Sequence, residues 1–425
     1  MNMFTTLMVL ALAAPAGGAA APDLGALLLL ADSNNPGIAA ARSRLLADAT
    51  IPSQLETMPD PVADISYTNV GYREPTLGDD GDAMLTVSWT QEVPYPGKLQ
   101  LAGEASRRGL EMSRQRLEQI RLDIAARVKM AYGELYHSDR VSQILRENRE
   151  LLASFLQTAR VRYETGEGLL QNVLKAQTEI VRLDAELEDF AEERRVAEAR
   201  LAALTGQTTP SPLAPALDLP GMTETIDTAS LESDALARSP QILESEAAIQ
   251  REETLHDLAR RQLKPDLIWG AAYTNRGDID PAFTGSFGMR LPLFRERKQT
   301  QMIAMTAHQV DAAKQDLAGK RLSIASEVRE LSARVIRTTS LEKFYQEAIL
   351  PQARSSLDSA AAAYGVGRVD FLTLLSDFTA LLGYERDYVT QHHERFLALA
   401  GLERLTARTL IDTGSDTRTP REVAP

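Results

Sequence analysis

Few side chains in this sequence have the types and spacings that catalysis requires, and each candidate motif lacks a necessary member. In "PGKL", Leu99 stands where a phosphate-binding loop needs Ser or Thr after its lysine. "GVGR" (365–368) joins two expected helices, whereas a dinucleotide-binding fingerprint follows a strand. "HHERF" (392–396) lacks the second histidine of a zinc-protease helix, and no G-x-S-x-G motif occurs. We therefore expect no enzyme activity and no cofactor.

Three residues with soft-metal ligand chemistry, Met302, Met305 and His308, follow one another at steps of three. Their position at the start of a long helix favours packing in the core instead, so we expect no metal site, and contact with a metal stays an open alternative. His392 and His393 point about 100° apart on a helix, and we expect both to face solvent.

Composition excludes several other classes of site. The chain has no cysteine, which rules out disulfides, thiolate metal sites, cysteine nucleophiles and a lipid-modified N-terminal cysteine. The formal charge of −13 argues against nucleic acid as a partner, because a phosphate-binding face needs a basic patch. Aromatic residues make up only 5% of the sequence, and Ala, Leu, Glu, Arg and Gln dominate long stretches of it. This composition is typical of long helices or coiled coils.

The N-terminus has the pattern of a secretory signal. A short apolar stretch (4–14) precedes small residues with Ala-x-Ala-like cleavage sites, so residues 1–21 are predicted to be a signal peptide. The apolar stretch "ALLLLAD" (26–32) then begins the first helix of the mature chain. No later stretch approaches the roughly 18 apolar residues that a transmembrane helix needs.

The rest of the chain is one unit written twice. Five pairs of segments match in the same order: 35–38 with 239–242, 59–69 with 265–275, 85–95 with 283–293, 163–174 with 364–375, and 203–205 with 404–406. We expect a first repeat over 22–206, a Pro-rich connector over 207–230, a second repeat over 231–410 and a flexible tail over 411–425. "NPGI" and "SPQI", the first matched pair, each lie inside an Ala-rich segment that is expected to be helical.

Each repeat predicts a short helix, a β-hairpin and a long helical hairpin. The β-hairpins are expected over 60–95 and 265–293, and the helical hairpins over 97–206 and 295–410. In the strands, apolar residues such as Val87 and Trp89 alternate with polar ones such as Ser88, so each hairpin has one apolar and one polar face. The loops "GYREPTLGDDGDA" (71–83) and "RGDIDPA" (276–282) are expected to face solvent.

The strands have the length of outer-membrane barrel strands, ten to twelve tilted residues across an apolar band of about 25 Å. Four strands cannot close a barrel, and open sheet edges are not tolerated in lipid. If these strands meet lipid, several copies of the chain must build the barrel together. A proline ends each hairpin before the long helix, and we assign Pro94, Pro96, Gly97 and Pro292 to the two strand-to-helix junctions.

The ordered combination of repeat, hairpins, "VPYPGK", "LPLF" and the turns "RYETGEG" and "YGVGR" resembles the outer membrane factors, the TolC-like exit ducts of Gram-negative efflux systems. The resemblance implies a mainly α fold with a membrane β-barrel: a homotrimer whose four strands per protomer complete a 12-stranded barrel in outer-membrane lipid, on a long α-helical periplasmic tunnel. It also implies a periplasmic adaptor and an inner-membrane pump, of the resistance-nodulation-division type, as partners. "MPDP" and "PYPGKL" are most similar to the branch that serves heavy-metal efflux.

The resemblance further implies a gate and an adaptor-docking region at the turns between the long helices. The residues that match it are Tyr163, Gly166, Gly168, Tyr364, Gly365, Gly367, Arg368 and Asp370. Where relatives place paired aspartates in a constricting ring, this chain has Thr373 and Ser376. We expect Tyr364 and Arg368 to close the duct against neighbouring turns, with Asp370 as a partner.

An exported soluble coiled-coil scaffold is the alternative from another functional class. It would explain the long helices. It would not explain β-hairpins that carry both tryptophans of the chain, Trp89 and Trp269, on their apolar faces.

Overall fold

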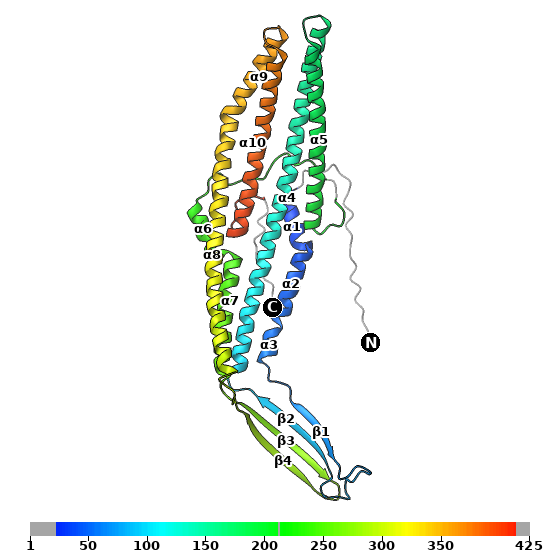
Figure 1. Cartoon of the computed structure of the whole chain (residues 1–425), viewed down its shortest axis with the longest axis vertical. Coiled ribbons are helices and arrows are strands. Elements are labelled where there is room, and N and C mark those ends of the chain that lie inside the picture. The colour runs from blue at the N-terminus through cyan, green and yellow to red at the C-terminus, as the bar shows by residue number, and fades with distance from the viewer. Residues whose placement is uncertain (1–22, 211–212, 414–425) are drawn as a thin grey trace.

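The computed structural model describes residues 23–210 and 213–413, so the expected signal peptide (1–21) lies outside the described residues. The protein is elongated, with a four-stranded sheet at one end and, at the other, the two turns that join pairs of long helices (Figure 1). Long helices run between these ends, and shorter helices flank them near the middle and beside the sheet. None of the described helices is both long enough and apolar enough to cross a membrane.

The first repeat forms three short helices, a β-hairpin and two long helices. Their bounds are α1 (Leu24–Asn34), α2 (Pro36–Ala49), α3 (Ile51–Glu56), β1 (Val62–Thr68), β2 (Met84–Val93), α4 (Lys98–Glu164) and α5 (Leu170–Leu204). The 67 residues of α4 span about 100 Å at 1.5 Å per residue. This single helix therefore runs from the sheet to the distant turn, as its uninterrupted sequence predicts.

The second repeat follows the same order with one interruption. Its elements are α6 (Thr228–Arg238), α7 (Pro240–Arg261), β3 (Asp266–Arg276), β4 (Ile279–Arg290), α8 (Gln299–Phe344), η1 (Tyr345–Ile349), α9 (Leu350–Gly365) and α10 (Phe371–Thr406). The π-helical turn η1 divides the expected continuous helix just before Pro351. Proline lacks an N–H, and its ring would press on the carbonyl of Glu347 in a regular α-helix, so a locally widened turn accommodates it.

"NPGI" and "SPQI" mark breaks between helices, and the expectation that each lies inside one helix is wrong. Asn35 caps α2, accepting from the backbone N of Gly37 at 2.8 Å, and Pro36 takes the first helical position. Ser239 and Pro240 occupy the same two places at the start of α7. An extended cap residue followed by proline suits a helix start, because the first helical N–H needs no intrahelical partner.

The four strands form one antiparallel sheet in the order β1-β2-β3-β4. The two hairpins, about two hundred residues apart in the chain, join through β2 and β3, which pair from Leu85↔Asn275 to Val93↔Leu267. In the second hairpin, β4 already begins at Ile279. The expected seven-residue loop over 276–282 is therefore wrong: the turn is confined to Gly277 and Asp278, and Gly277 has the positive φ of 72° that such a tight turn uses.

The hydrophobic core follows the contacts of α4 with α5 and α10, and extends to the short helices at mid-length. The chain after α10 joins this core. Ile411 is fully buried and pairs with Met222, and the Glu403 carboxylate accepts from the backbone N of Leu410 at 2.6 Å. The packed chain therefore extends through Ile411, where a flexible tail was expected to begin.

Candidate functional site

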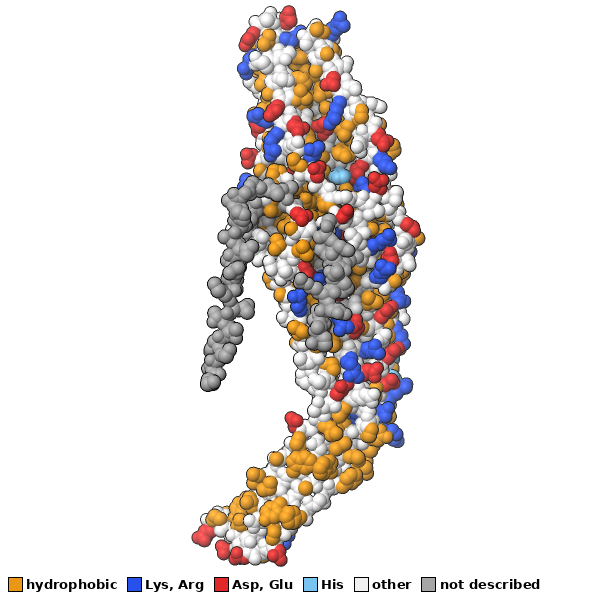
Figure 2. Space-filling view, turned by 180° about the vertical axis from the view of Figure 1, so that it is seen from behind, with side chains coloured by type: hydrophobic (Ala, Val, Ile, Leu, Met, Phe, Trp, Pro, Cys, Tyr) orange, Lys and Arg blue, Asp and Glu red, His pale blue; other side chains and the backbone are white. Residues whose placement is uncertain are grey.

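One face of the sheet is apolar and exposed along its length. A row of four side chains crosses all four strands at one level: Ile65, Val87, Tyr273 and Phe283. Ile65 is 73% exposed and Phe283 is 82% exposed, values that are costly in water for large apolar side chains. Figure 2 shows hydrophobic side chains gathered over the sheet and acidic ones at its far end.

Both tryptophans lie on this apolar face, as the sequence pattern predicts. The Trp89 and Trp269 rings meet edge to face, with their centroids 4.6 Å apart. Phe287, 73% exposed, is paired with Trp269 across β3 and β4. The face that carries these residues has the composition of a surface that contacts lipid.

The opposite face of the sheet is polar. Its rows contain Thr86, Ser88, Thr284 and Ser286, together with Asp64 and Ser66 on β1. The Thr86 and Thr274 hydroxyls lie 3.2 Å apart across β2 and β3. Arg290 on β4 forms an ion pair with Glu92 on β2, with one N···O distance of 2.9 Å. This face is suited to water.

The sheet is unfinished at both sides. β1 and β4 are its edge strands, and each has a hydrogen-bonded neighbour on one side only. An open edge in lipid would leave a row of backbone N–H and C=O groups without partners. The sheet can therefore enter a membrane only if other strands complete it.

The first strand-to-helix junction has the predicted residues and a buried ion pair that the sequence analysis missed. β2 ends at Val93 and α4 begins at Lys98, with Pro94 to Gly97 between them; Gly97 has a φ of 89°, a conformation that favours glycine. Lys98 is only 6% exposed, and its amine donates to the Asp266 carboxylate at 2.8 Å and to the Lys264 carbonyl at 2.9 Å. Asp266 also accepts from the backbone N of Tyr95 at 2.7 Å.

These contacts bind the first junction to the start of β3, and so fix the strand of one repeat to the helix of the other. Both partners were visible in the sequence, as the Lys of "PGKL" and the Asp of the second Pro-Asp pair. Their proximity was not, because 168 residues separate them. The second junction is looser. Pro292 lies two residues after β4, and α8 begins only at Gln299.

The two distant turns are built alike. Gly166 and Gly367 occupy matching places and have positive φ values of 79° and 76°. Gly168 packs tightly, since an added Cβ would lie 3.0 Å from the backbone N of Tyr163. Gly365 ends α9 and has open space around it. Glycine is required by backbone conformation at the first two positions and by close packing at the third.

Tyr364 has a different environment from the one expected. It is 4% exposed and packs against Phe371, with ring centroids 5.6 Å apart. The Arg162 guanidinium lies 5.2 Å from the Tyr364 ring centroid and donates to the Tyr364 carbonyl. Burial raises the pKa of Tyr364, and Arg162 opposes this rise. Tyr364 therefore joins the two turns of one protomer, and Arg162, which sequence reasoning missed, is its partner.

The other turn residues lie on the surface. Tyr163 is 45% exposed and Arg368 is exposed. Asp370 caps α10 and accepts from the backbone N of Thr373 at 2.8 Å. Its hydrogen bonds with Thr373 lower the pKa of the Asp370 carboxyl. Within the protomer the structure does not bring Tyr364, Arg368 and Asp370 into one hydrogen-bonded group.

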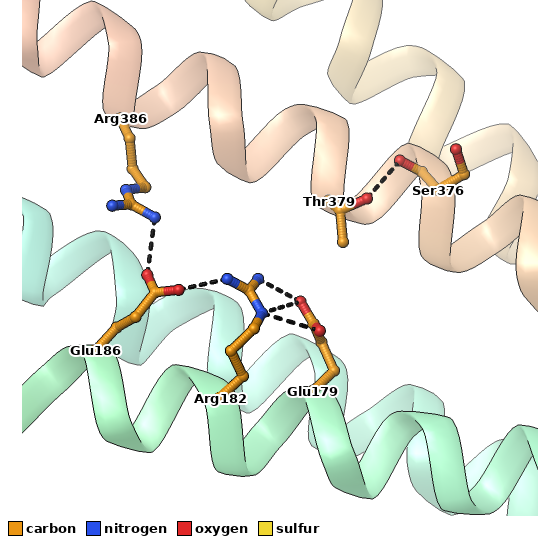
Figure 3. Close-up of polar contacts among 6 residues, drawn as sticks. All are labelled: Glu179, Arg182, Glu186, Ser376, Thr379 and Arg386. Carbon is orange, nitrogen blue, oxygen red and sulfur yellow. Dashed lines mark hydrogen bonds and ion pairs between the residues drawn. The ribbon is translucent and has the colours of Figure 1, made fainter.

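A chain of charged residues joins the two helical hairpins further along the helices from the turns, toward the sheet (Figure 3). Arg386 on α10 donates to the Glu186 carboxylate on α5 at 2.8 Å. Glu186 also binds Arg182, which reaches Glu179 one turn along α5 at 3.0 Å. The two helical hairpins of a protomer are thus held side by side by alternating charges as well as by apolar packing.

Two predictions about lone side chains are wrong. His392 and His393 are partly buried at the contact of α10 with α4, because neighbouring helices cover α10 on more than one side. Met302 and Met305 are 41% and 50% exposed, and His308 is exposed, so these three do not pack in the protomer's core. Across 23–210 and 213–413, no group of three or more His, Asp or Glu residues is placed to hold a metal.

The amino-acid sequence matches the model of the outer membrane efflux protein family over residues 22–207 and 231–408. The chain belongs to this family. The match covers both repeats and leaves out the connector between them, and it agrees with the predicted internal duplication. No curated protein sequence matches the chain.

Solved structures of outer-membrane channels share the fold. The outer-membrane channel OprN is 21% identical with a TM-score of 0.77, covering 92% of this chain and 91% of its own. VceC, an outer membrane protein from Vibrio cholerae, is 19% identical with a TM-score of 0.77, covering 91% and 96%. CusC, whose structures describe transmembrane channel formation, is 14% identical with a TM-score of 0.76, covering 93% and 95%.

Family membership confirms the predicted class of function. The protein is an outer-membrane efflux channel that spans the outer membrane and the periplasm. The family is one of passive channels rather than of enzymes. The apolar face of the sheet is the part of this efflux channel suited to lipid, and the long helices reach into the periplasm. Family membership decides against the alternative, an exported soluble scaffold.

Proposed function

We propose that three copies of this chain form one duct, with a 12-stranded barrel made from three four-stranded sheets. The observation that carries the proposal is a sheet with one exposed apolar face, one polar face and two open edges. Pairing β1 of each copy with β4 of the next satisfies both edges and turns the polar face inward. Native mass spectrometry of the detergent-solubilised protein tests the stoichiometry, and a stable monomer without detergent would contradict it.

We infer that the repeats act as the two building units of each protomer, with boundaries near 22–206 and 231–410. The matching order of elements and the similar turns of the two halves support this division. Three protomers would then supply six helical hairpins to the tunnel. The Pro-rich connector and the short helices α1 and α6 would lie around its middle.

We propose that the turns at 163–168 and 364–370 line the periplasmic mouth and close it. Glu167 and Arg368 hold matching positions in the two turns, and their charges are opposite. The Glu167 side chain is 70% exposed and Arg368 is exposed, so both are accessible to a neighbouring turn. In a trimer these turns alternate around the mouth, so a Glu167 would lie beside an Arg368.

Single-channel conductance in planar bilayers tests the gate. Replacing Tyr364→Phe together with Arg368→Ser removes a hydroxyl and a guanidinium, and conductance should rise while the trimer stays intact. Arg195→Ser is a matched control, since Arg195 is exposed on α5 and its partner among the described residues is Glu192 on the same helix. An unchanged conductance in the double variant would remove Tyr364 and Arg368 from the gate.

We propose that a periplasmic adaptor docks at the same end and connects the duct to an inner-membrane pump of the resistance-nodulation-division type. A groove beside the turns supports an α-helical partner. Its lining combines apolar and charged side chains from α5 and α10: Leu170, Leu174, Lys175, Glu179 and Leu375. Leu174→Glu should weaken adaptor binding in a pull-down of the purified pair, and Leu322→Glu, on α8, should not.

For the substrate we propose heavy-metal ions, on the resemblance of "MPDP" and "PYPGKL" to that branch of the family. A strain lacking the gene should become sensitive to copper, silver, zinc, cadmium or cobalt salts and recover when the gene is restored. Sensitivity to drugs or detergents alone would contradict this choice of substrate. It would leave the duct itself unaffected.

A further inference from the structure

Two histidines from different helical hairpins face each other at the contact of α4 and α10. The His137 and His393 ring centroids are 5.0 Å apart, with the rings inclined by 30°. His137 Nε2 lies 3.3 Å from the Thr390 hydroxyl, and the His393 ring packs against Gly133, where an added Cβ would lie 3.2 Å from it. His393 Nε2 is buried and has no hydrogen-bond partner.

Among the residues that the structure describes, no carboxylate forms a hydrogen bond or ion pair with His137 or His393. Arg386 lies over the Phe190 ring, which also contacts His137. The Arg386 guanidinium is itself paired with the Glu186 carboxylate. On α8, Glu342 is bound to Arg395 at 3.0 Å and reaches His392 at 3.5 Å. Nearby titratable or charged groups are Tyr136, Arg140 and Asp139 on α4, Arg194 on α5, and Tyr388 on α10, with Arg194 paired with Asp139. Glu134 on α4 is bound to Arg200, and Glu394 on α10 is bound to Arg337 at 2.6 Å.

A proton on either histidine would therefore place a positive charge beside a second imidazole and near Arg386. His392 differs in its surroundings, because it lies 3.5 Å from the Glu342 carboxylate. We propose that the His137–His393 contact is an acid-sensitive packing contact between the two helical hairpins of a protomer. It holds the hairpins together and the tunnel narrow at neutral pH, and it lets the hairpins separate in an acidic periplasm. The link to tunnel width rests on the proposed duct.

The direction of the effect follows from burial. Burial, together with His137 and His392, lowers the pKa of His393 to about 4 from the ordinary value of 6.5, and burial and Arg386 lower the pKa of His137. A group with a lowered pKa binds a proton more readily once the packing loosens. The packed state is therefore fully favoured above about pH 6.5, and its advantage is lost progressively as the pH falls toward about 4.

The size of the effect can be set from these two values. If His393 returns to its ordinary pKa in the loosened state, the ratio of loosened to packed forms rises about 30-fold between pH 7.5 and pH 5. His137 would add to this rise. A change of this size lies within the range of single-channel recording.

The purified full-length duct in planar bilayers tests the proposal. Open probability or conductance should rise between pH 7.5 and pH 5, and His137→Gln with His393→Gln should reduce that rise at least tenfold. His308→Gln is the control, because His308 is exposed on α8 and should leave the response at the wild-type size. An equal acid response in the double variant, or no acid response in the wild type, would overturn the proposal that this contact is acid-sensitive.

Histidine NMR titration of the same protein in detergent gives a readout that needs no pore. His393 should titrate near pH 4 while the fold is intact. Its signal is assigned as the one that is missing from the spectrum of His393→Gln. Titration at the ordinary value of 6.5 would overturn the proposal and leave the duct standing. Failure to form pores, with His393 titrating near pH 4, would instead count against the proposed duct.

Discussion

Replacing Val87 by Arg should destabilise the protein strongly, whereas the same change at the next residue should not. Val87 lies on the apolar face, 45% exposed, in the row that also contains Ile65, Tyr273 and Phe283. It is the fourth of ten residues in β2, so it is close to the middle of the apolar band and not at either rim. Arg near the midplane of a membrane barrel costs about 2–4 kcal/mol, and we expect about 2–3 kcal/mol here.

Ser88 is the matched control because only the side of the sheet changes. It lies on the polar face, directly opposite Asp64 on β1, so an arginine there meets water and a carboxylate. We expect a change within about 0.5 kcal/mol for Ser88→Arg, the usual range for surface substitutions. Reversible unfolding in lipid vesicles measures both variants. Equal costs at the two positions would show that the assignment of the faces is wrong.

Other predictions concern the junction and the turns. Lys98→Met should cost about 3 kcal/mol, because it leaves Asp266 largely buried without its cation; the same unfolding assay measures this, and a loss below 1 kcal/mol would make the ion pair incidental. Gly97→Ala should cost about 1–2 kcal/mol at a φ of 89°, while Pro94→Ala should cost less than about 1 kcal/mol; the reverse order would contradict our account of the junction. The Asp370 cap should stabilise the first turn of α10 fully above pH 3.8, and this stabilisation should be lost as the pH falls through the lowered pKa of Asp370. Hydrogen exchange at the Thr373 amide should then become faster. An exchange rate that is the same in Asp370→Ala as in the wild type would refute this role of the cap.

Local patterns predicted most of the fold. The period-two alternation placed Trp89 and Ser88 on opposite faces, and the sheet bears this out, because the register of neighbouring strands aligns apolar rows with apolar rows. Proline and glycine located the start of α4 within a few residues, since neither Pro94 nor Gly97 suits a strand interior. Signals of this kind depend only on residues close together in the chain.

The contacts of the candidate site depended on residues far apart, and most were not predicted. Arg162 lies 202 residues from Tyr364, so no local pattern could show that it binds the Tyr364 carbonyl. The prediction that His393 faces solvent failed for a related reason. A helix periodicity argument assumes one buried face, and α10 is covered on several sides, by α4, α8 and α9.

Disulfide cross-linking between sheet edges tests the central claim, a barrel shared by three copies. The chain has no cysteine, so Ser66→Cys on β1 with Thr284→Cys or Ser286→Cys on β4 reports only the introduced pair. Within one protomer, three strand spacings, about 14 Å, separate β1 from β4, too far for a disulfide. We predict that oxidation in intact outer membranes gives a covalent species of three chains, reversed by reductant. Oxidised protein that remains entirely monomeric across the set of pairs, or that forms chains of other lengths, would contradict the shared barrel.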